Sequence, residues 1–180
     1  MIQLVFETHS ISVDNELGRA TGWLPGALSE RGRALAVELG ERRRDDDLAA
    51  VFTSDLRRAV ETVELAFAGS GIPVVEDARL RECDYGELNG MPVARLEVLR
   101  RRHVDEPYPG GESYRQCVDR MRGFLADLQS DRDGRRVLVI GHSATRWALD
   151  HLLRGVPLEE LVDAPFAWQP GWLYLVPPAR

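Results

Sequence analysis

The stretch that decides the fold is RRVLVIGHSATRWALDHLLRG, residues 135–155. It predicts a strand at 136–140, whose last four residues, VLVI, form an apolar run typical of a strand buried on both faces. A tight turn of small residues follows, and helical periodicity then continues to about Leu153. A buried strand that leads directly into a helix is the building unit of a parallel sheet. His142 lies in the turn, at the carboxyl end of the strand.

Two further apolar runs, at 2–6 and 48–54, predict strands that are also buried. Segments with helical periodicity follow both of them, so strands and helices alternate along the chain. A last strand at 171–178 contains prolines, which are typical of a sheet edge. The alternation predicts an α/β fold, a three-layer αβα sandwich with a mostly parallel central sheet and helices on both faces.

The first predicted helix lies within 26–47 and is expected to start after Ser29, a favourable N-cap residue. Its apolar face is predicted to include Ala34, Val37 and Leu39. Periodicity predicts other helices within 54–71, 92–106 and 110–131.

The composition is that of one globular domain spanning 1–180, with 44% hydrophobic and 29% charged residues. A formal net charge of -6 argues against non-specific binding to nucleic acid or anionic membranes. No apolar run approaches the roughly 18 residues of a membrane-spanning helix. The start, MIQLVF, enters a strand directly, so we expect no signal peptide. Two cysteines, Cys83 and Cys117, are too few for a disulfide framework or a metal knot, and we expect a cytoplasmic location.

Two histidines occupy matching places in the predicted sheet. His9 follows the strand at 2–6, and His142 follows the strand at 136–140, each in a turn of small residues. If these strands are neighbours, the two imidazoles converge at the carboxyl edge, where ligands of open α/β sheets bind. The turn at 141–143 also opens a helix, whose free N–H groups favour an anion.

Charged residues are predicted to lie near the same edge. Arg57 and Arg58 begin the helix after the strand at 48–54, and a guanidinium directed inward offers paired hydrogen bonds to a phosphate. Glu82 stands in LRECDYGELNG, a segment with few helical features. Two histidines, an arginine and a glutamate together suit phosphoryl transfer, with an imidazole as nucleophile, cations on the oxygens and an acid at the leaving group.

Over most of its length the chain resembles the histidine phosphatase superfamily, also called phosphoglycerate mutase-like. Five segments carry the resemblance, in the order that the family has them: GWLPGALSERGRALA (22–36), SDLRRAVETVE (54–64), LRECDYGELNG (80–90), YPGGES (108–113) and VIGHS (139–143).

The resemblance implies a role for each matching residue. His9 would be the nucleophile that becomes phosphohistidine, and Glu82 would be the general acid. His142 and Arg58 would bind the transferred phosphoryl group, and Asn15 would add a polar contact. Further phosphate-binding candidates are the residues beside the two histidines: Ser10 and Ser143. The resemblance also implies no metal and no organic cofactor, with 80–113 as a lid over the site and variable loops such as 91–110 setting the substrate.

The first motif departs from the family. The family has Arg-His-Gly, whereas this chain has Thr8-His9-Ser10 and so lacks an arginine that clamps the phosphate. Loss of one preorganised donor typically lowers the rate by about 10²–10³. Arg19 and Arg146 are candidate replacements, and we favour Arg146, which shares a helix face with His142. Another departure is an aspartate in place of a usual proline: Asp55.

Glu7 has three interpretations. In the first, the strand has already turned at this point and Glu7 pairs with an arginine. In the second, Glu7 orients the imidazole of His9, two residues along the strand. In the third, His9, His142 and a carboxylate from Glu7 or Glu82 form a metal site with ligands known for zinc or iron.

The sequence thus favours a phosphomonoester hydrolase that acts on a small phosphorylated metabolite through a phosphohistidine on His9. The alternative is a catalytically weak or silent family member that binds an anionic metabolite or a protein partner. A metal-dependent activity is third. No nucleic acid or membrane partner is expected. Two tryptophans near the end of the chain, Trp168 and Trp172, are candidates for a homodimer contact if they are exposed, although core packing is the more common fate of tryptophan.

Overall fold

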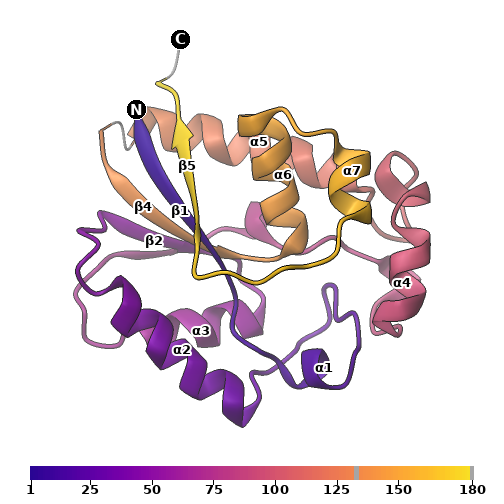
Figure 1. The fold of residues 1–180 in the computed structure, drawn as a ribbon, viewed down its shortest axis with the longest axis horizontal. Coiled ribbons are helices and arrows are strands. Elements are labelled where there is room, and N and C mark those ends of the chain that lie inside the picture. The colour runs from indigo at the N-terminus through magenta and orange to yellow at the C-terminus, as the bar shows by residue number, and fades with distance from the viewer. Residues whose placement is uncertain (132–133, 179–180) are drawn as a thin grey trace.

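The structure is a computed structural model that describes residues 1–131 and 134–178. Its centre is a five-stranded sheet with the strand order β3-β2-β4-β1-β5 (Figure 1). The strands are β1 (Ile2–Thr8), β2 (Ala50–Thr53), β3 (Val74–Glu76), β4 (Arg136–Gly141) and β5 (Trp172–Val176). Neighbouring strands run parallel except β5, which pairs antiparallel with β1 at one edge of the sheet. The mostly parallel sheet and the edge strand predicted from the sequence are confirmed.

Helices cover both faces of the sheet. The helices α2 (Glu30–Arg43) and α3 (Arg57–Ala66) lie on one face, and α5 (Tyr114–Asp131) and α6 (Ser143–Arg154) lie on the other (Figure 1). Shorter elements complete the chain: α1 (Val13–Glu16), α4 (Val93–Leu99), α7 (Leu158–Asp163) and 3-10 turns at Ala78–Leu80, Gly86–Leu88 and Arg102–Val104. The predicted αβα architecture is therefore correct. The helix predicted over 92–106 is shorter than expected, and α7 was not predicted.

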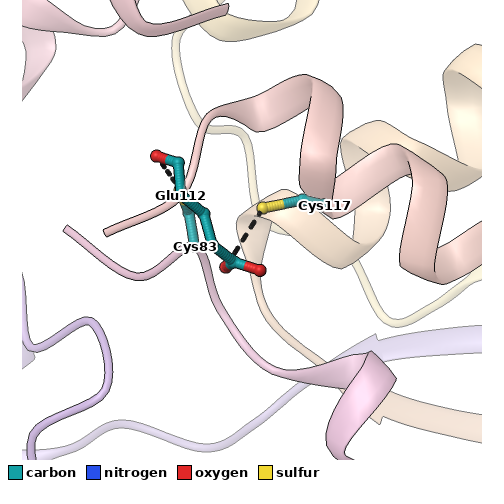
Figure 2. Close-up of side chains that lie close together, drawn as sticks. All are labelled: Cys83, Glu112 and Cys117. Carbon is teal, nitrogen blue, oxygen red and sulfur yellow. Dashed lines mark hydrogen bonds between the residues drawn. The ribbon is translucent and has the colours of Figure 1, made fainter. Parts of the chain in front are cut away.

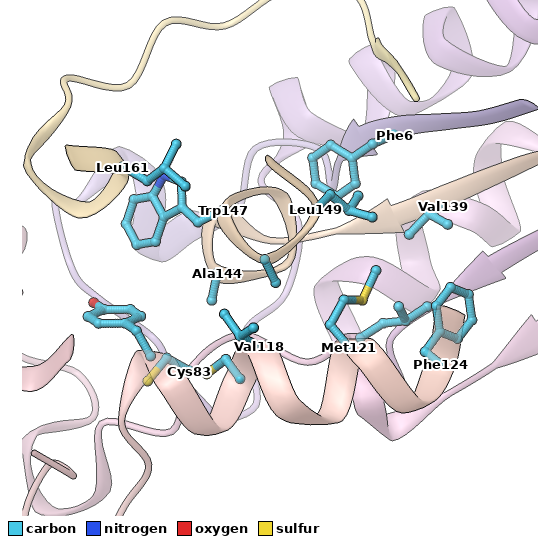
Figure 3. Packing of buried hydrophobic residues seen from close by; sticks show 14 of the residues in the cluster. Phe6, Cys83, Val118, Met121, Phe124, Val139, Ala144, Trp147, Leu149 and Leu161 are labelled. Atoms are coloured by element: carbon cyan, nitrogen blue, oxygen red, sulfur yellow. The ribbon is translucent and has the colours of Figure 1, made fainter. Parts of the chain in front are cut away.

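The two layers bury alternate side chains of the same strands. Val137 and Val139 of β4 belong to the core beneath α5 and α6, whereas Leu138 and Ile140 belong to the core beneath α2 and α3. Figure 3 shows the first core, where Leu149 of α6 lies beside Phe6 of β1, and Trp147 of the same helix lies beside Leu161 of α7. A strand with apolar side chains on both faces explains why these runs lack polar alternation.

The start of α2 is as predicted, but of its predicted apolar face only Leu39 is buried. The Ser29 hydroxyl accepts a hydrogen bond from the backbone of Gly32 at 3.0 Å, which is the expected cap. Ala34 and Val37 are exposed, contrary to the predicted apolar face. The buried face consists of Gly32, Ala36, Leu39 and Gly40. A Cβ at Gly40 would lie 2.0 Å from a carbonyl oxygen of α3, so this glycine lets the two helices approach closely, while Leu39 packs in the apolar core beside them.

The tryptophans near the end of the chain differ in exposure. Trp168 is 59% exposed, whereas Trp172 is 7% exposed and packs against Phe6 of β1. Trp172 therefore has the core packing of the two alternatives and not the exposure of a dimer contact, because its side chain points to the covered face of the edge strand. Among the described residues, no helix is long and apolar enough to cross a membrane.

Glu7 is an acidic residue in the middle of this sheet, and it is 1% exposed. Its carboxylate accepts hydrogen bonds from Arg43 Nε at 2.8 Å and from Arg42 Nη2 at 3.1 Å, both at the end of α2. Arg43 also donates to the carbonyl of Pro170 at 2.8 Å, just before β5. Of the three interpretations of Glu7, pairing with arginine is the one that the structure shows. The ion pairs join β1, α2 and the approach to β5.

Because Glu7 is buried between two arginines, we expect Glu7→Gln to lower the free energy of unfolding by about 1.5–3 kcal/mol, the range for hydrogen bonds to charged groups. Arg42→Met removes only the more exposed partner and is expected to lower it by about 0–1 kcal/mol. Urea denaturation of both variants measures the two values. If both variants lost the same small amount of unfolding free energy, Glu7 would behave as a surface charge.

Candidate active site

The two predicted site histidines lie side by side. β1 and β4 are neighbours and pair in the register Thr8↔Gly141, and the backbone N–H of His9 donates to the carbonyl of Gly141 at 2.9 Å. The ring centroids of His9 and His142 are 5.0 Å apart, with planes inclined at 51°. The convergence expected from the strand positions is present.

His9 carries its proton on the nitrogen that faces the backbone. Its Nδ1 lies 2.6 Å from the carbonyl oxygen of Ser10, which can only accept, so Nδ1 is the protonated nitrogen and Nε2 keeps its lone pair. Burial, and then the charge of Arg58, lower the pKa of His9 to about 3, against the opposing effect of the Ser10 hydrogen bond. At neutral pH the imidazole is therefore an uncharged nucleophile with a free nitrogen.

His142 is held from both sides. Its Nδ1 lies 3.4 Å from Arg58 Nη2, which can only donate, so the ring proton is on Nε2 and is donated to the Ser54 hydroxyl at 2.7 Å. Burial, followed by the charges of Arg58 and His9, lowers the pKa of His142 well below its usual value. His142 is therefore neutral and fixed in orientation.

Arg58, in the first turn of α3, is the cation of the site and is 3% exposed. Its Nη2 donates to the carbonyl of Gly22 at 2.9 Å and also reaches His142. Its Nη1 is buried and has no hydrogen-bond partner among the described residues. An unsatisfied buried donor is unfavourable, so the site is suited to an anion that would accept from this nitrogen.

The side chain of Glu82 lies against the first turn of α6, close to His142. Its Oε1 accepts hydrogen bonds from the backbone N–H groups of Cys83 at 2.8 Å and Ala144 at 3.2 Å. Burial lowers the pKa of Arg58, and the nearby negative charge of Glu82 opposes that shift. The predicted acid is thus present at the edge of the same site, held by backbone donors.

A cluster behind Glu82 was missed in the sequence. Ligand-type atoms of Cys83, Glu112 and Cys117 lie within 4.8 Å of one another (Figure 2). Arg120 already supplies the cation here, because its guanidinium donates to both Glu112 oxygens, at 3.0 and 3.2 Å, and to the Cys117 sulfur at 3.3 Å. Arg120 also donates to the carbonyl of Glu82 at 3.0 Å. The cluster therefore fits an arginine and supports the Glu82 segment from behind.

A metal held by the histidines does not fit these residues either. Both ring nitrogens of His142 are engaged, by Ser54 and by Arg58, and a guanidinium in contact with the imidazole disfavours a second cation there. Glu7, the alternative carboxylate ligand, is directed to α2. The donor set and its charge suit an anionic ligand.

Three other predicted residues have contacts outside the pair of histidines. The Ser10 hydroxyl donates to the carbonyl of Gly32 in α2 at 2.6 Å. The Asn15 side chain accepts from the backbone N–H of Ser12 at 2.9 Å and caps α1. Ser143 is the first residue of α6 and is half-buried. Their contacts with a phosphate stay predictions.

Arg146, the favoured substitute for the missing arginine, lies against aromatic rings. Its guanidinium carbon is 5.1 Å from the ring centroid of Trp172 and 6.0 Å from that of Phe166. Its Nε is buried and, within residues 1–131 and 134–178, has no hydrogen-bond partner. Within these described residues, it is Arg58, and not Arg146, whose guanidinium contacts a site histidine. Replacement of the first-motif arginine by Arg146 stays a prediction.

Sequence reasoning missed Ser54 although a signal for it existed. Ser54 follows β2 as His9 follows β1 and His142 follows β4, and β2 is the neighbour of β4. The same positional rule that selected the histidines therefore also selects Ser54.

Comparison with known proteins agrees with this geometry. The family model described as "Histidine phosphatase superfamily (branch 1)" matches residues 6–171. The chain belongs to the histidine phosphatase superfamily. It is 31% identical over 170 residues to phosphoserine phosphatase 1 of Hydrogenobacter thermophilus, covering 89% of this chain and 80% of the relative. It is 35% identical over 190 residues to 2,3-bisphosphoglycerate-dependent phosphoglycerate mutase 2 of Gloeobacter violaceus, covering 94% and 87%.

Solved structures give the same result. The mycobacterial glucosyl-3-phosphoglycerate phosphatase superposes with a TM-score of 0.80 at 28% identity, covering 89% of this chain and 85% of that one. YhfR of Bacillus stearothermophilus superposes with a TM-score of 0.81 at 27% identity, covering 94% and 88%. The phosphoglycerate mutase-like fold expected from the sequence is confirmed.

The low pKa of His9 predicts a pH-dependent stability. A histidine whose pKa is lower in the folded than in the unfolded protein is protonated first in the unfolded chain, so acidification favours unfolding. With a folded pKa of about 3 and an unfolded value of 6.5, His9 alone lowers the free energy of unfolding by about 2 kcal/mol from pH 6.5 to about 4.5. Urea denaturation should show this extra loss in wild type relative to His9→Gln. If the free energy of unfolding fell with pH equally in the two proteins, His9 would not be held neutral in the folded state.

Proposed function

We propose that this protein hydrolyses a small phosphomonoester through a phosphohistidine intermediate on His9. The observation that carries the proposal is the buried Nη1 of Arg58, which has no hydrogen-bond partner in the part of the chain that the structure describes. It lies beside two neutral imidazoles, one of which keeps the lone pair of its Nε2. Membership of the histidine phosphatase superfamily supports the same chemistry. The protein is a metal-independent phosphatase in this proposal.

In the first step, Nε2 of His9 attacks the phosphorus atom and the bond from phosphorus to the ester oxygen breaks. Glu82 protonates the departing oxygen, while Arg58 and His142 hold the other phosphate oxygens. In the second step, Glu82 takes a proton from a water molecule, the water attacks the phosphohistidine, and inorganic phosphate leaves. Each proton that Glu82 gives in the first step is regained in the second.

The remaining predicted residues surround this centre. We propose Ser143, Ser10 and Asn15 as further phosphate contacts. Segment 80–113, which includes Glu82, acts as the lid of a single domain that spans 1–180. The names of the relatives, a phosphoserine phosphatase and a glucosyl-3-phosphoglycerate phosphatase, support a small phosphorylated metabolite as substrate.

A second candidate is an anion-binding protein with weak or no catalysis. Thr8 favours it, because the strand that carries His9 ends in a hydroxyl where the family supplies a guanidinium. Arg58 would then be the main phosphate clamp. Binding of phosphate needs only this clamp, whereas stabilisation of the transition state gains from each additional donor.

The two candidates differ in the hydrolysis of p-nitrophenyl phosphate, assayed from about pH 4.5 to about pH 8 with and without chelator. We expect turnover in wild type that chelator does not change and that His9→Ala abolishes, since the nucleophile is lost. Arg58→Met should lower kcat/KM by about 10²–10³, the usual effect of removing one oxyanion donor. Turnover retained in His9→Ala would contradict the phosphohistidine route.

Thr8→Arg is the matched variant for the second candidate. No turnover in wild type, together with activity in Thr8→Arg, would mean that the scaffold is intact but lacks its clamp, and would favour binding over hydrolysis. Turnover in wild type that rises further in Thr8→Arg supports the hydrolase.

A further inference from the structure

An ion pair joins the segment of the acid to the segment that holds His142. Arg81 precedes Glu82 in the chain, and Asp55 follows Ser54, whose hydroxyl contacts His142. The Arg81 guanidinium donates to both carboxylate oxygens of Asp55, from Nε at 2.6 Å and from Nη2 at 2.5 Å. Paired hydrogen bonds of this kind fix the angle between two groups as well as their distance. The contact thus sets the position of the Glu82 segment relative to the turn between β2 and α3.

Trp23 extends the contact to a third segment. The Arg81 guanidinium carbon lies 4.5 Å from the centroid of the Trp23 ring, and the indole N–H donates to the carbonyl of Glu82 at 2.7 Å. Trp23 follows Gly22, whose carbonyl accepts from Arg58. Arg81 therefore lies between the aspartate of one segment and the indole of another, and both segments also bind site residues.

Glu82 needs such support because its segment has no regular structure. Residues 81–85 form neither helix nor strand, so no ladder of backbone hydrogen bonds fixes them. The carboxylate of Glu82 is held by two backbone N–H groups, and its carbonyl by Trp23 and Arg120. Arg81 is the contact that ties this segment to the turn after β2.

We infer that Arg81 and Asp55 are positioning residues that hold the Glu82 carboxyl group at the leaving-group oxygen of a phosphomonoester. The inference rests on the proposed function. Asp55, which stands where the family usually has proline, is given a role by this inference. The ion pair governs protonation of the leaving group, so its contribution is largest for substrates that leave as poorly stabilised alkoxides.

The electrostatics of the pair suit a kinetic test. The hydrogen bonds from Arg81 hold the pKa of Asp55 below its usual value, so the pair stays charged throughout the pH range of a phosphatase assay. The side chains are 27% and 29% exposed. Ion pairs with this exposure add little to global stability, so variants of the pair are expected to fold.

The experiment compares two substrates in wild type, Arg81→Met and Asp55→Asn. p-Nitrophenyl phosphate releases an acidic phenol that needs little protonation, whereas glycerol phosphate releases an alkoxide that needs the proton of Glu82. The quantity to compare is kcat/KM, which reports the first step alone, because Glu82 also acts as the base of the second step, which is the same for both substrates. We expect both variants to lower kcat/KM for glycerol phosphate about tenfold, a part of the roughly 10²–10⁴ that general acid catalysis supplies. Their kcat/KM for p-nitrophenyl phosphate should change less than about twofold, by the same reasoning.

Two further variants sharpen the result. In the double variant Arg81→Met/Asp55→Asn the losses should not multiply, because the residues act through one contact. Arg101→Met is the matched control, since it removes a surface ion pair, with Asp163, that touches neither Glu82 nor His142. It should leave the ratio of the two rates as in wild type.

Equal losses for both substrates, or no loss for either, would overturn the inference and leave the proposed function standing. Wild-type protein that hydrolyses neither substrate would overturn the proposed function, and this inference with it. A selective loss that Arg101→Met reproduces would also overturn it, because the effect would then not come from this contact.

Discussion

Parallel pairing of β1 with β4 is the interaction on which the site depends. The register Thr8↔Gly141 places the residues that follow both strands at the same level, which brings the rings of His9 and His142 to 5.0 Å. β2 lies on the other side of β4 and delivers Ser54 to His142, and the helix that follows delivers Arg58. A slip of one residue in this pairing would turn the apolar side chains of β1 to the opposite faces and separate the imidazoles.

Burial gives the site its electrostatic character. Both imidazoles are kept neutral by loss of solvent and by the guanidinium beside them. Arg58 is buried, and one of its nitrogens has no hydrogen-bond partner within residues 1–131 and 134–178, in a place where an anion would complete its hydrogen bonds. The protein thus holds the proposed nucleophile, the guanidinium and the proposed acid in place before a phosphate arrives, which is the preorganisation that electrostatic catalysis requires. Holding unpaired polar groups in this way lowers stability and is a common feature of functional sites.

The sequence predicted those parts of the fold and site that depend on strand position. Apolar runs located the strands, and the residue after each strand located His9 and His142 and could have located Ser54. The positions of side chains on loops and helices were harder to predict, because tertiary contacts decide where those side chains point. Ser10 is directed to α2, since a Cβ at Gly32 would lie 1.8 Å from a carbonyl oxygen of Ile11 and the loop passes directly over the helix. Cys83 and Cys117 meet only because a long irregular segment folds back, and no periodicity reports that.

The central claim is a covalent phosphohistidine on His9, and trapping it is the most direct test. Enzyme mixed with p-nitrophenyl phosphate, a substrate with a good leaving group, is quenched in alkali within the first turnover and analysed by intact-protein and peptide mass spectrometry. The account predicts one phosphoryl group per chain, on the peptide that contains His9, stable in alkali and lost in acid. Hydrolysis that proceeds with the phosphoryl group on another residue, or with none trapped during a measured burst of nitrophenol, would contradict it.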